Sequence, residues 1–209
     1  RRADAVTVLS DDLRDNVAGK LGRHRPERVV VIPNFVDTER IRPTDPDNSY
    51  RAENDLTGRT VVMYAGNVGL SQSLDLVVEA ARRFRDRGRD DVVFVINGGG
   101  SALAGLQESA RGLDNLRFVG MQPRERLPEV LAAGDLHLVP LRTGLARSSV
   151  PSKLYSILAA GRPVLASVDG GTEVATTIER AGAGVSVPPE DADRFVAALD
   201  RMLADRTAL

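Results

Sequence analysis

The chain has 209 residues, and its 28 Lys and Arg against 29 Asp and Glu give a net charge of −1, so charge does not support a nucleic acid as the general partner. It contains no Cys, which excludes disulfides and a Cys nucleophile, and no apolar run approaches the roughly 20 residues of a membrane-spanning helix. It begins with Arg rather than Met, and we expect it to be a piece of a longer protein.

The first 36 residues predict one strand–helix unit followed by a second strand. Asp4–Leu9 is strand-like, Ser10 is a good N-cap, and Asp11–Leu21 is predicted to form a short helix whose early acids suit its positive end. The second strand is predicted at Arg28–Ile32. Prolines then interrupt the chain, so we expect residues 37–54 to form a linker without regular structure.

From residue 55 onward, strands that are apolar on both faces alternate with amphipathic helices. The clearest helix is Leu74–Phe84, and the predicted strands are Thr60–Ala65, Asp91–Ile96, Leu116–Gly120, Asp135–Leu141, Arg162–Ser167 and Ala183–Pro188. This pattern predicts an α/β fold with a doubly wound, mainly parallel, Rossmann-like sheet. Such sheets bind ligands beyond the carboxyl ends of their strands. The loops to search are therefore 66–72, 97–101, 120–124, 142–153 and 169–173.

Two glycine-rich turns follow adjacent predicted strands. Gly66–Gly69 (GNVG) and Asn97–Gly100 (NGGG) could let backbone N–H groups approach a phosphate, and each could equally be a tight turn. The first lacks the full G-x-G-x-x-G pattern, and Asn97 stands where a dinucleotide-binding protein would carry an acid. A dinucleotide-dependent oxidoreductase is therefore the poorest candidate.

Residues 139–167 predict a strand, a polar loop, a short helix and a further strand. Ser152 is expected to cap the helix with its side chain, and Gly161 to end it in a left-handed conformation. Three cations surround the predicted helix start: Arg142, Arg147 and Lys153. The dipole would favour an acid at the first helical position, so a bound anion explains the lysine better than a solvated side chain does. The anion we favour is a diphosphate.

The remaining acidic, histidine and arginine patterns are predicted to be structural rather than part of a functional site. The D-x-D triplets Asp45–Asp47 and Asp191–Asp193 do not follow strand ends, and no metal site is expected. His137 lies within an apolar run and is predicted to be a strand residue rather than a base. The arginines between residues 82 and 89 are expected to form a solvated helix end.

The sequence resembles the C-terminal, donor-binding domain of GT-B glycosyltransferases, specifically the family-4 retaining enzymes. The resemblance covers almost the whole chain and is carried by VVMYAGNVGLSQSLDLVVEAAR from residue 61, RFVGMQPRERLPEVLAAGDLHLVPL from residue 117 and PSKLYSILAAGRPVLAS from residue 151. It implies that residues 1–36 are the last unit of an N-terminal domain and the start of a linker, 37–54 the linker, and 55–209 a C-terminally truncated donor-binding domain. The third segment is closest to the subgroup that builds bacterial O-antigen, capsule and other surface polysaccharides.

The resemblance implies transfer of a sugar from a nucleoside diphosphate, most often UDP, to a saccharide or lipid-linked acceptor. The nucleotide sugar would be a substrate, with no cofactor. The acceptor site would lie on the N-terminal domain, so we expect these 209 residues alone not to turn over. Action in the cytoplasm is implied, with peripheral contact to the inner face of the membrane through that absent domain. A sugar-nucleotide epimerase and a catalytically silent nucleotide-binding module remain alternatives.

The resemblance also assigns roles to the loops. It places Gly66–Gly69 near the donor phosphates, Val119–Gln122 near the base, Ser149–Lys153 near the diphosphate and Gly170–Glu173 near the sugar. The candidate donor-binding residues are Gly66, Asn67, Val68, Gly69, Asn97, Gly98, Val119, Met121, Gln122, Arg142, Arg147, Ser149, Ser152, Lys153, Ser156 and Glu173.

The chain departs from the family pattern at four positions. Two Glu separated by seven residues are usual in the family, and here these places fall on Ser148 and Ser156. An Arg and a Lys that neutralise the diphosphate in many relatives align with Asn67 and Gln72. Ser148 is the candidate catalytic residue, and the charge for the diphosphate is expected from Arg142, Arg147 or Lys153.

Overall fold

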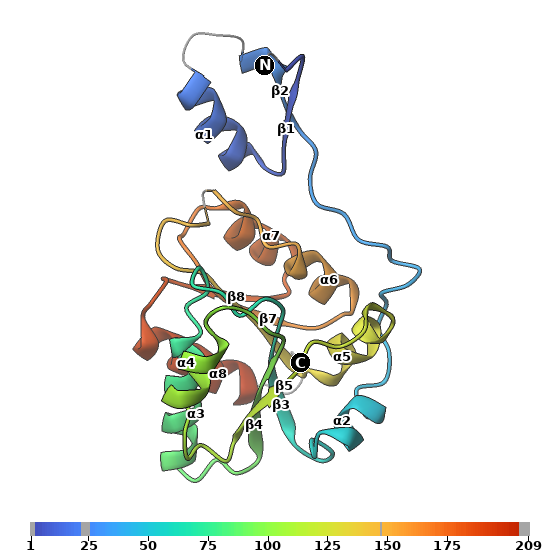
Figure 1. Cartoon of the computed structure of the whole chain (residues 1–209), viewed down its shortest axis with the longest axis vertical. Coiled ribbons are helices and arrows are strands. Elements are labelled where there is room, and N and C mark those ends of the chain that lie inside the picture. The colour runs from blue at the N-terminus through green and yellow to red at the C-terminus, as the bar shows by residue number, and fades with distance from the viewer. Residues whose placement is uncertain (1–2, 22–25, 147, 205–209) are drawn as a thin grey trace.

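The computed structural model describes residues 3–21, 26–146 and 148–204, which form a small N-terminal unit and a larger α/β domain (Figure 1). In the small unit, β1 (Val6–Val8) pairs in parallel with β2 (Val29–Val31), and α1 (Asp11–Leu21) connects them, followed by a short 3₁₀ turn at Pro26–Arg28. The bounds of α1 are those predicted, because the capping side chain of Ser10 accepts a hydrogen bond from the Leu13 N–H at 3.2 Å. No helix in the described part of the chain is long and apolar enough to cross a membrane.

The main sheet has six parallel strands in the order β5-β4-β3-β6-β7-β8. They are β3 (Thr60–Ala65), β4 (Val92–Asn97), β5 (Leu116–Val119), β6 (Leu136–Pro140), β7 (Val164–Ser167) and β8 (Gly184–Val187). The chain runs outward from β3 to β5, then returns to the other side of β3 and runs outward again to β8. The strand order therefore reverses between β3 and β6, where sheets of this kind form a crevice. The predicted doubly wound, Rossmann-like sheet is confirmed.

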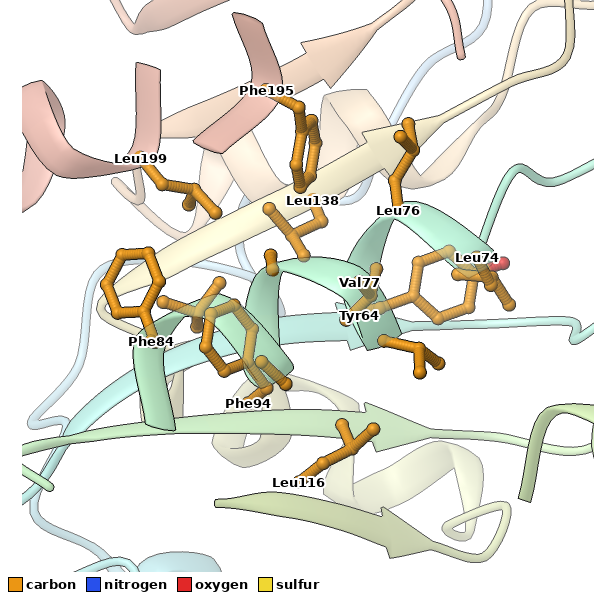
Figure 2. Close-up of a cluster of buried hydrophobic side chains, with 14 of the residues drawn as sticks. Tyr64, Leu74, Leu76, Val77, Phe84, Phe94, Leu116, Leu138, Phe195 and Leu199 are labelled. Carbon is orange, nitrogen blue, oxygen red and sulfur yellow. The ribbon is translucent and has the colours of Figure 1, made fainter. Parts of the chain in front are cut away.

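Helices cover both faces of this sheet, as continuous apolar strands require. The helices are α2 (Ser49–Glu53), α3 (Asp75–Asp86), α4 (Leu103–Ser109), α5 (Leu127–Ala133), α6 (Lys153–Ala159), α7 (Glu173–Ala181) and α8 (Ala192–Ala204), with a 3₁₀ turn at Arg124–Arg126. Helices α3, α4 and α8 pack on one face around Phe84, Phe94 and Phe195, all fully buried (Figure 2). Helices α2, α5, α6 and α7 cover the other face.

The prediction of a linker without regular structure is wrong at its end, where α2 forms. Asn48 caps this helix, because its side chain accepts a hydrogen bond from the Arg51 N–H. Tyr50 is fully buried under the sheet, and Arg51 forms an ion pair with Asp135 at 2.7 Å. The last residues of the linker are therefore part of the domain that follows them.

Candidate functional site

A cavity of about 550 Å³ opens at the carboxyl ends of β3, β4 and β6, at the reversal of strand order. The residues lining it are Tyr64, Ala65, Gly66, Asn67, Gln72, Asn97, Met121, Gln122, Pro123, Arg124, Leu127, Val130, Leu131, Leu141, Ser149, Pro151, Ser152, Lys153 and Ser156. The loops after β3, β5 and β6 contribute to it, together with Asn97 at the end of β4. The structure therefore brings together four of the five loops that the sequence singled out.

Lys153 is the first residue of α6 and reaches across the cavity toward β3. Its Nζ lies 3.7 Å from the centroid of the Tyr64 ring, a distance at which an ammonium group is attracted to the ring. Burial lowers the pKa of Lys153 to about 7, because removal from water disfavours the charged amine. Since no acid lines the described part of the cavity, an incoming anion would provide the missing countercharge.

Ser152 lies where the prediction put it, at the start of α6, but it does not cap the helix with its side chain. Its backbone is already helical, with φ −59° and ψ −25°, and its hydroxyl accepts no capping hydrogen bond. The side chain instead lines the cavity. The other end of the helix follows the prediction, since Gly161 has φ +66°, a left-handed conformation that favours glycine.

The two glycine-rich turns pack against each other, and only part of each lines the cavity. Gly66 and Asn67 line it, whereas Val68 is fully buried in the core and Gly69 lies outside. A Cβ on Gly98 would lie 1.9 Å from the carbonyl oxygen of Gly66, and Gly98 does not line the cavity. The turn at residues 97–100 therefore carries glycine so that one loop backbone can lie directly on the other.

Arg142 lies away from the cavity, contrary to the expectation that it would supply charge to a diphosphate there. Its guanidinium donates to the Leu70 carbonyl at 2.7 Å and pairs with Glu190 at 2.9 Å. This pairing also lowers the pKa of Glu190, for which hydrogen bonds from Thr143 are the largest cause. Arg147 lies outside the described residues.

The remaining candidate serines, from the polar loop and from helix α6, differ in whether they line the cavity. Ser149 and Ser156 line the cavity. Ser148, the candidate catalytic residue, is exposed outside the lining, and its hydroxyl donates to the Leu145 carbonyl at 3.1 Å. Its catalytic role stays a prediction, and the structure places it at the edge of the site rather than within it.

Glu173 and Val119 also lie outside the cavity lining. Glu173 is the first residue of α7, and its backbone N–H donates to the Asp12 carboxylate of the N-terminal unit at 2.7 Å. Val119 ends β5 and packs against the apolar cluster beneath the sheet. Met121 and Gln122, from the loop that follows, do line the cavity.

Arg124 is a lining residue that the sequence did not single out. It lies one residue beyond Pro123, in the loop expected to hold the base, and its spacing alone did not distinguish it from the neighbouring exposed arginines. Together with Lys153 it gives the cavity two cations. Among the described lining residues there is no Asp, Glu or His.

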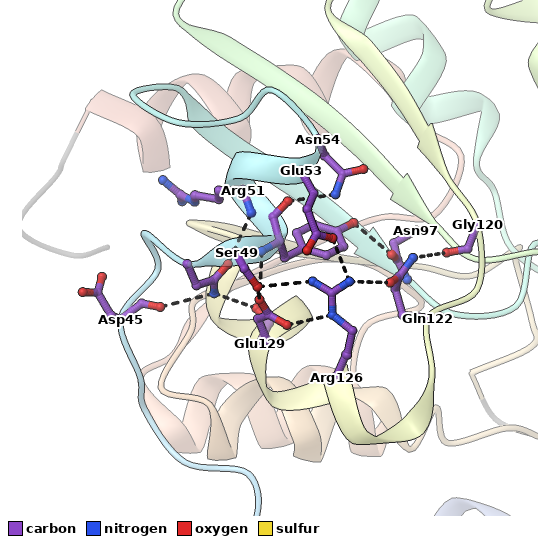
Figure 3. A network of polar contacts seen from close by, with 12 residues as sticks. Asp45, Ser49, Arg51, Glu53, Asn54, Asn97, Gly120, Gln122, Arg126 and Glu129 are labelled. Carbon is purple, nitrogen blue, oxygen red and sulfur yellow. Dashed lines mark hydrogen bonds and ion pairs between the residues drawn. The ribbon is translucent and has the colours of Figure 1, made fainter.

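A network of polar contacts joins the linker helix α2 to this loop (Figure 3). Arg126 pairs with Glu53 and with Glu129, each at 2.8 Å, and also donates to the Gln122 side chain at 3.3 Å. The Gln122 amide in turn donates to the Gly120 carbonyl at 3.1 Å. The conformation of the cavity loop is therefore tied to the end of the linker.

His137 plays no part in the site, as predicted. It is fully buried in β6, its Nε2 lies 2.8 Å from the Leu131 carbonyl, and burial lowers its pKa to about 4. The arginines at the end of α3 form ion pairs at the surface, including Arg87 with Asp200 at 2.8 Å, which agrees with a solvated helix end. The described residues hold no group of three or more His, Asp or Glu placed to bind a metal ion.

A six-stranded parallel sheet with helices on both faces and a cavity at its switch point defines a doubly wound α/β domain, and solved GT-B glycosyltransferases share this fold. HepE of Anabaena, solved in complex with UDP-glucose, superposes with a TM-score of 0.79 at 17% identity, covering 100% of this chain and 56% of that one. WaaG, a glycosyltransferase involved in lipopolysaccharide biosynthesis, superposes with a TM-score of 0.77 at 19% identity, covering 97% of this chain and 54% of that one. These similarities show the fold.

The family model described as "Glycosyl transferases group 1" matches residues 59–205, and the chain belongs to this family. WcaI of Escherichia coli K12, named as a colanic acid biosynthesis glycosyl transferase, is 36% identical over 183 residues, which are 85% of this chain and 44% of that protein. The alpha-D-kanosaminyltransferase of Streptomyces kanamyceticus is 29% identical over 214 residues, covering 98% of this chain and 52% of that protein. The chain spans about half the length of these curated relatives.

Proposed function

We propose that this chain is the donor-binding domain of a retaining glycosyltransferase that uses a UDP-sugar and transfers the sugar to a saccharide or lipid-linked acceptor. The observation that carries the proposal is the cavity at the β3–β6 switch point, whose described lining has two cations and no acid. The diphosphate of a nucleotide sugar carries two negative charges and its base is a flat heteroaromatic ring, and the same lining offers apolar surface at Leu127, Val130 and Leu131 for the faces of such a ring. Charge and shape therefore both fit this ligand.

Within this proposal, Lys153 holds the diphosphate and stabilises it as it departs. Its amine already lies beside Gly66, in the space that a Cβ at this position would need. A fixed cation in a partly dry site stabilises developing negative charge more strongly than it would in water. Arg124, which follows β5, is the second cation in the described lining.

The acceptor and the second wall of the active site belong to a part of the protein outside this chain. The relatives that it matches are about twice as long. We therefore propose that the 209 residues bind the donor but do not transfer the sugar alone, and that any contact with the inner face of a cytoplasmic membrane comes from the absent domain.

A nucleotide-binding module without turnover is the second candidate, and the acid-free lining favours it. Family members carry Glu where this chain has Ser148 and Ser156, and no described lining residue replaces either carboxylate. An epimerase would need an acid or His at the sugar. Glu173, the one acid among the residues expected near the donor, lies outside the lining.

Titration calorimetry of the chain with UDP, GDP and NAD tests the proposal. We expect UDP to bind most tightly. Binding of NAD alone would contradict the glycosyltransferase assignment. Sugar transfer by the full-length protein separates the two candidates, because the silent module predicts donor binding without any product.

A further inference from the structure

Asn97 is a polar residue in a position that the fold otherwise fills with apolar side chains. It ends β4, and its side chain follows Val93 and Val95 on the face covered by α2 and α5. It is 5% exposed and lines the cavity. A buried amide in such a place needs partners for its oxygen and for its nitrogen.

The oxygen of this amide is held by Tyr50, 47 residues earlier in the chain. The Tyr50 hydroxyl donates to Asn97 Oδ1 at 2.9 Å, and the whole Tyr50 side chain is buried. The tyrosine is itself fixed, because its backbone N–H donates to Glu129 at 2.8 Å and its carbonyl accepts from Asn54 at 2.8 Å. Burial also raises the pKa of Tyr50, so its hydroxyl stays protonated as a donor.

The nitrogen of the same amide has no partner among the described residues. Only its oxygen takes part in a hydrogen bond, and the residue faces the cavity. An amide oxygen can only accept and an amide nitrogen can only donate, so the Tyr50 contact leaves the two N–H groups for whatever enters the cavity. A ligand that displaces water from this donor without accepting a hydrogen bond from it would therefore bind more weakly.

The position of Asn97 in the sheet indicates which part of the ligand it meets. Asn97 pairs in register with Val119, whose following loop supplies Met121 and Gln122 to the cavity. Lys153 comes from α6, after β6, on the other side of β3. Asn97 therefore lies beside the loop expected to hold the base, across β3 from helix α6, and only the long side chain of Lys153 reaches back as far as Gly66.

We propose that Tyr50 orients the Asn97 amide so that it donates to the exocyclic oxygen O4 of a uracil base, which makes Asn97 a specificity residue and Tyr50 its positioning residue. The inference rests on the proposed function, because it takes the ligand to be a nucleoside diphosphate. Cytosine carries an amino donor at the same position, which an amide N–H cannot satisfy. The site therefore selects UDP over CDP, two ligands with the same diphosphate.

The test is the ratio of the dissociation constants of CDP and UDP, measured by calorimetry on the 209-residue chain. We expect the wild type to prefer UDP by about tenfold or more. Asn97→Asp turns an oxygen toward the base and should shift the preference toward CDP, since any repulsion of the diphosphate cancels in the ratio. Tyr50→Phe frees the amide to rotate and should bring the ratio close to one.

Two controls separate a loss of Asn97 orientation from a general loss of structure or of diphosphate binding. Tyr155→Phe also removes a phenolic hydroxyl, from a side chain outside the cavity lining, and should leave the ratio unchanged. Pyrophosphate affinity should be the same in the wild type, Tyr50→Phe and Asn97→Ala. A drop in Asn97→Ala would mean that the amide meets phosphate instead of base, and would overturn the inference.

The inference and the proposed function fail in different ways. A wild type that binds UDP and keeps its preference in both Tyr50→Phe and Asn97→Asp would overturn the inference alone. A wild type that binds neither nucleotide would overturn both. If Tyr50→Phe does not fold, the two Asn97 variants still decide the outcome.

Discussion

The amine of Lys153 lies 3.7 Å from the centre of the Tyr64 ring and occupies the space that a side chain on Gly66 would need. The ring attracts the cation only weakly compared with a full countercharge. Burial consequently lowers the pKa of Lys153 to about 7. This lysine is held beside the glycine-rich turn at residues 66–69, and the described lining of the cavity offers no acid to compensate its charge.

UDP binding should therefore depend on pH between 7 and 9. Free Lys153 loses its proton above its pKa of about 7, and a bound diphosphate raises that pKa, so binding takes up a proton in this range. The affinity for UDP should fall as pH rises, approaching tenfold per pH unit. Calorimetry in buffers of different ionisation enthalpy measures the uptake. In Lys153→Met the uptake should vanish, and an unchanged uptake would contradict the assignment.

Gly66→Ala should weaken UDP binding through Lys153. The new Cβ would lie 2.6 Å from Nζ, and the φ of +143° at this position strains any residue with a side chain. We expect roughly a tenfold loss of affinity, reflecting one displaced charged contact. Repeating the substitution in Lys153→Met gives a double-mutant cycle, in which the loss should shrink. An equal loss in both backgrounds would show that the two residues act independently.

Gly98→Ala should destabilise the domain, whereas Gly99→Ala should not. A Cβ on Gly98 would meet the Gly66 carbonyl oxygen at 1.9 Å, while one on Gly99 meets nothing within 4 Å. Forcing these two backbones apart should lower the free energy of unfolding by about 2–3 kcal/mol. Urea denaturation of both variants measures the difference. Equal midpoints would mean that the turn can open without cost.

Glu129 should stabilise the domain above pH 4.5 and lose this effect as the pH falls toward 2. Hydrogen bonding from Arg126 is the largest cause that lowers its pKa from 4.5 to about 2, so the unfolded state binds the proton first. The wild type should therefore lose stability between pH 4.5 and 2 more steeply than Glu129→Gln. Urea denaturation midpoints across this pH range measure the loss of stability. Glu125→Gln, which changes an exposed acid in the adjacent turn, is the control. Parallel curves for the wild type and Glu129→Gln would contradict the role of the ion pair.

The sequence predicted the sheet well because its strands are buried on both faces. Runs such as Thr60–Ala65 are continuously apolar and lack the spacing of polar residues that marks an amphipathic helix. The structure places that strand at the predicted bounds. The prediction missed α2 because the prolines before Ser49 indicated an irregular linker. The helix is stabilised by an apolar tertiary contact that the local sequence does not show. That contact, Tyr50 under the sheet, depends on strands that follow it in the chain.

Within the site, sequence reasoning succeeded where a residue's place follows from its own loop. Lys153, Gly66 and Asn67 line the cavity because they directly follow strands or begin a helix at the switch point. The position of Arg142 could not be predicted in this way, because it lies outside the cavity lining and is paired with Glu190, 48 residues away on another loop. The glycines after Asn97 were equally ambiguous, since only the folded chain shows that they meet a neighbouring backbone.

The most direct test of the central claim is UDP titration of Lys153→Ala beside Arg142→Ala. Both substitutions remove a cation near the polar loop, but only Lys153 lines the cavity. We predict that Lys153→Ala weakens UDP binding about 10- to 100-fold, the effect of one charged hydrogen bond, while Arg142→Ala changes it less than about twofold. UDP affinity unchanged in Lys153→Ala, or lost only in Arg142→Ala, would contradict the account.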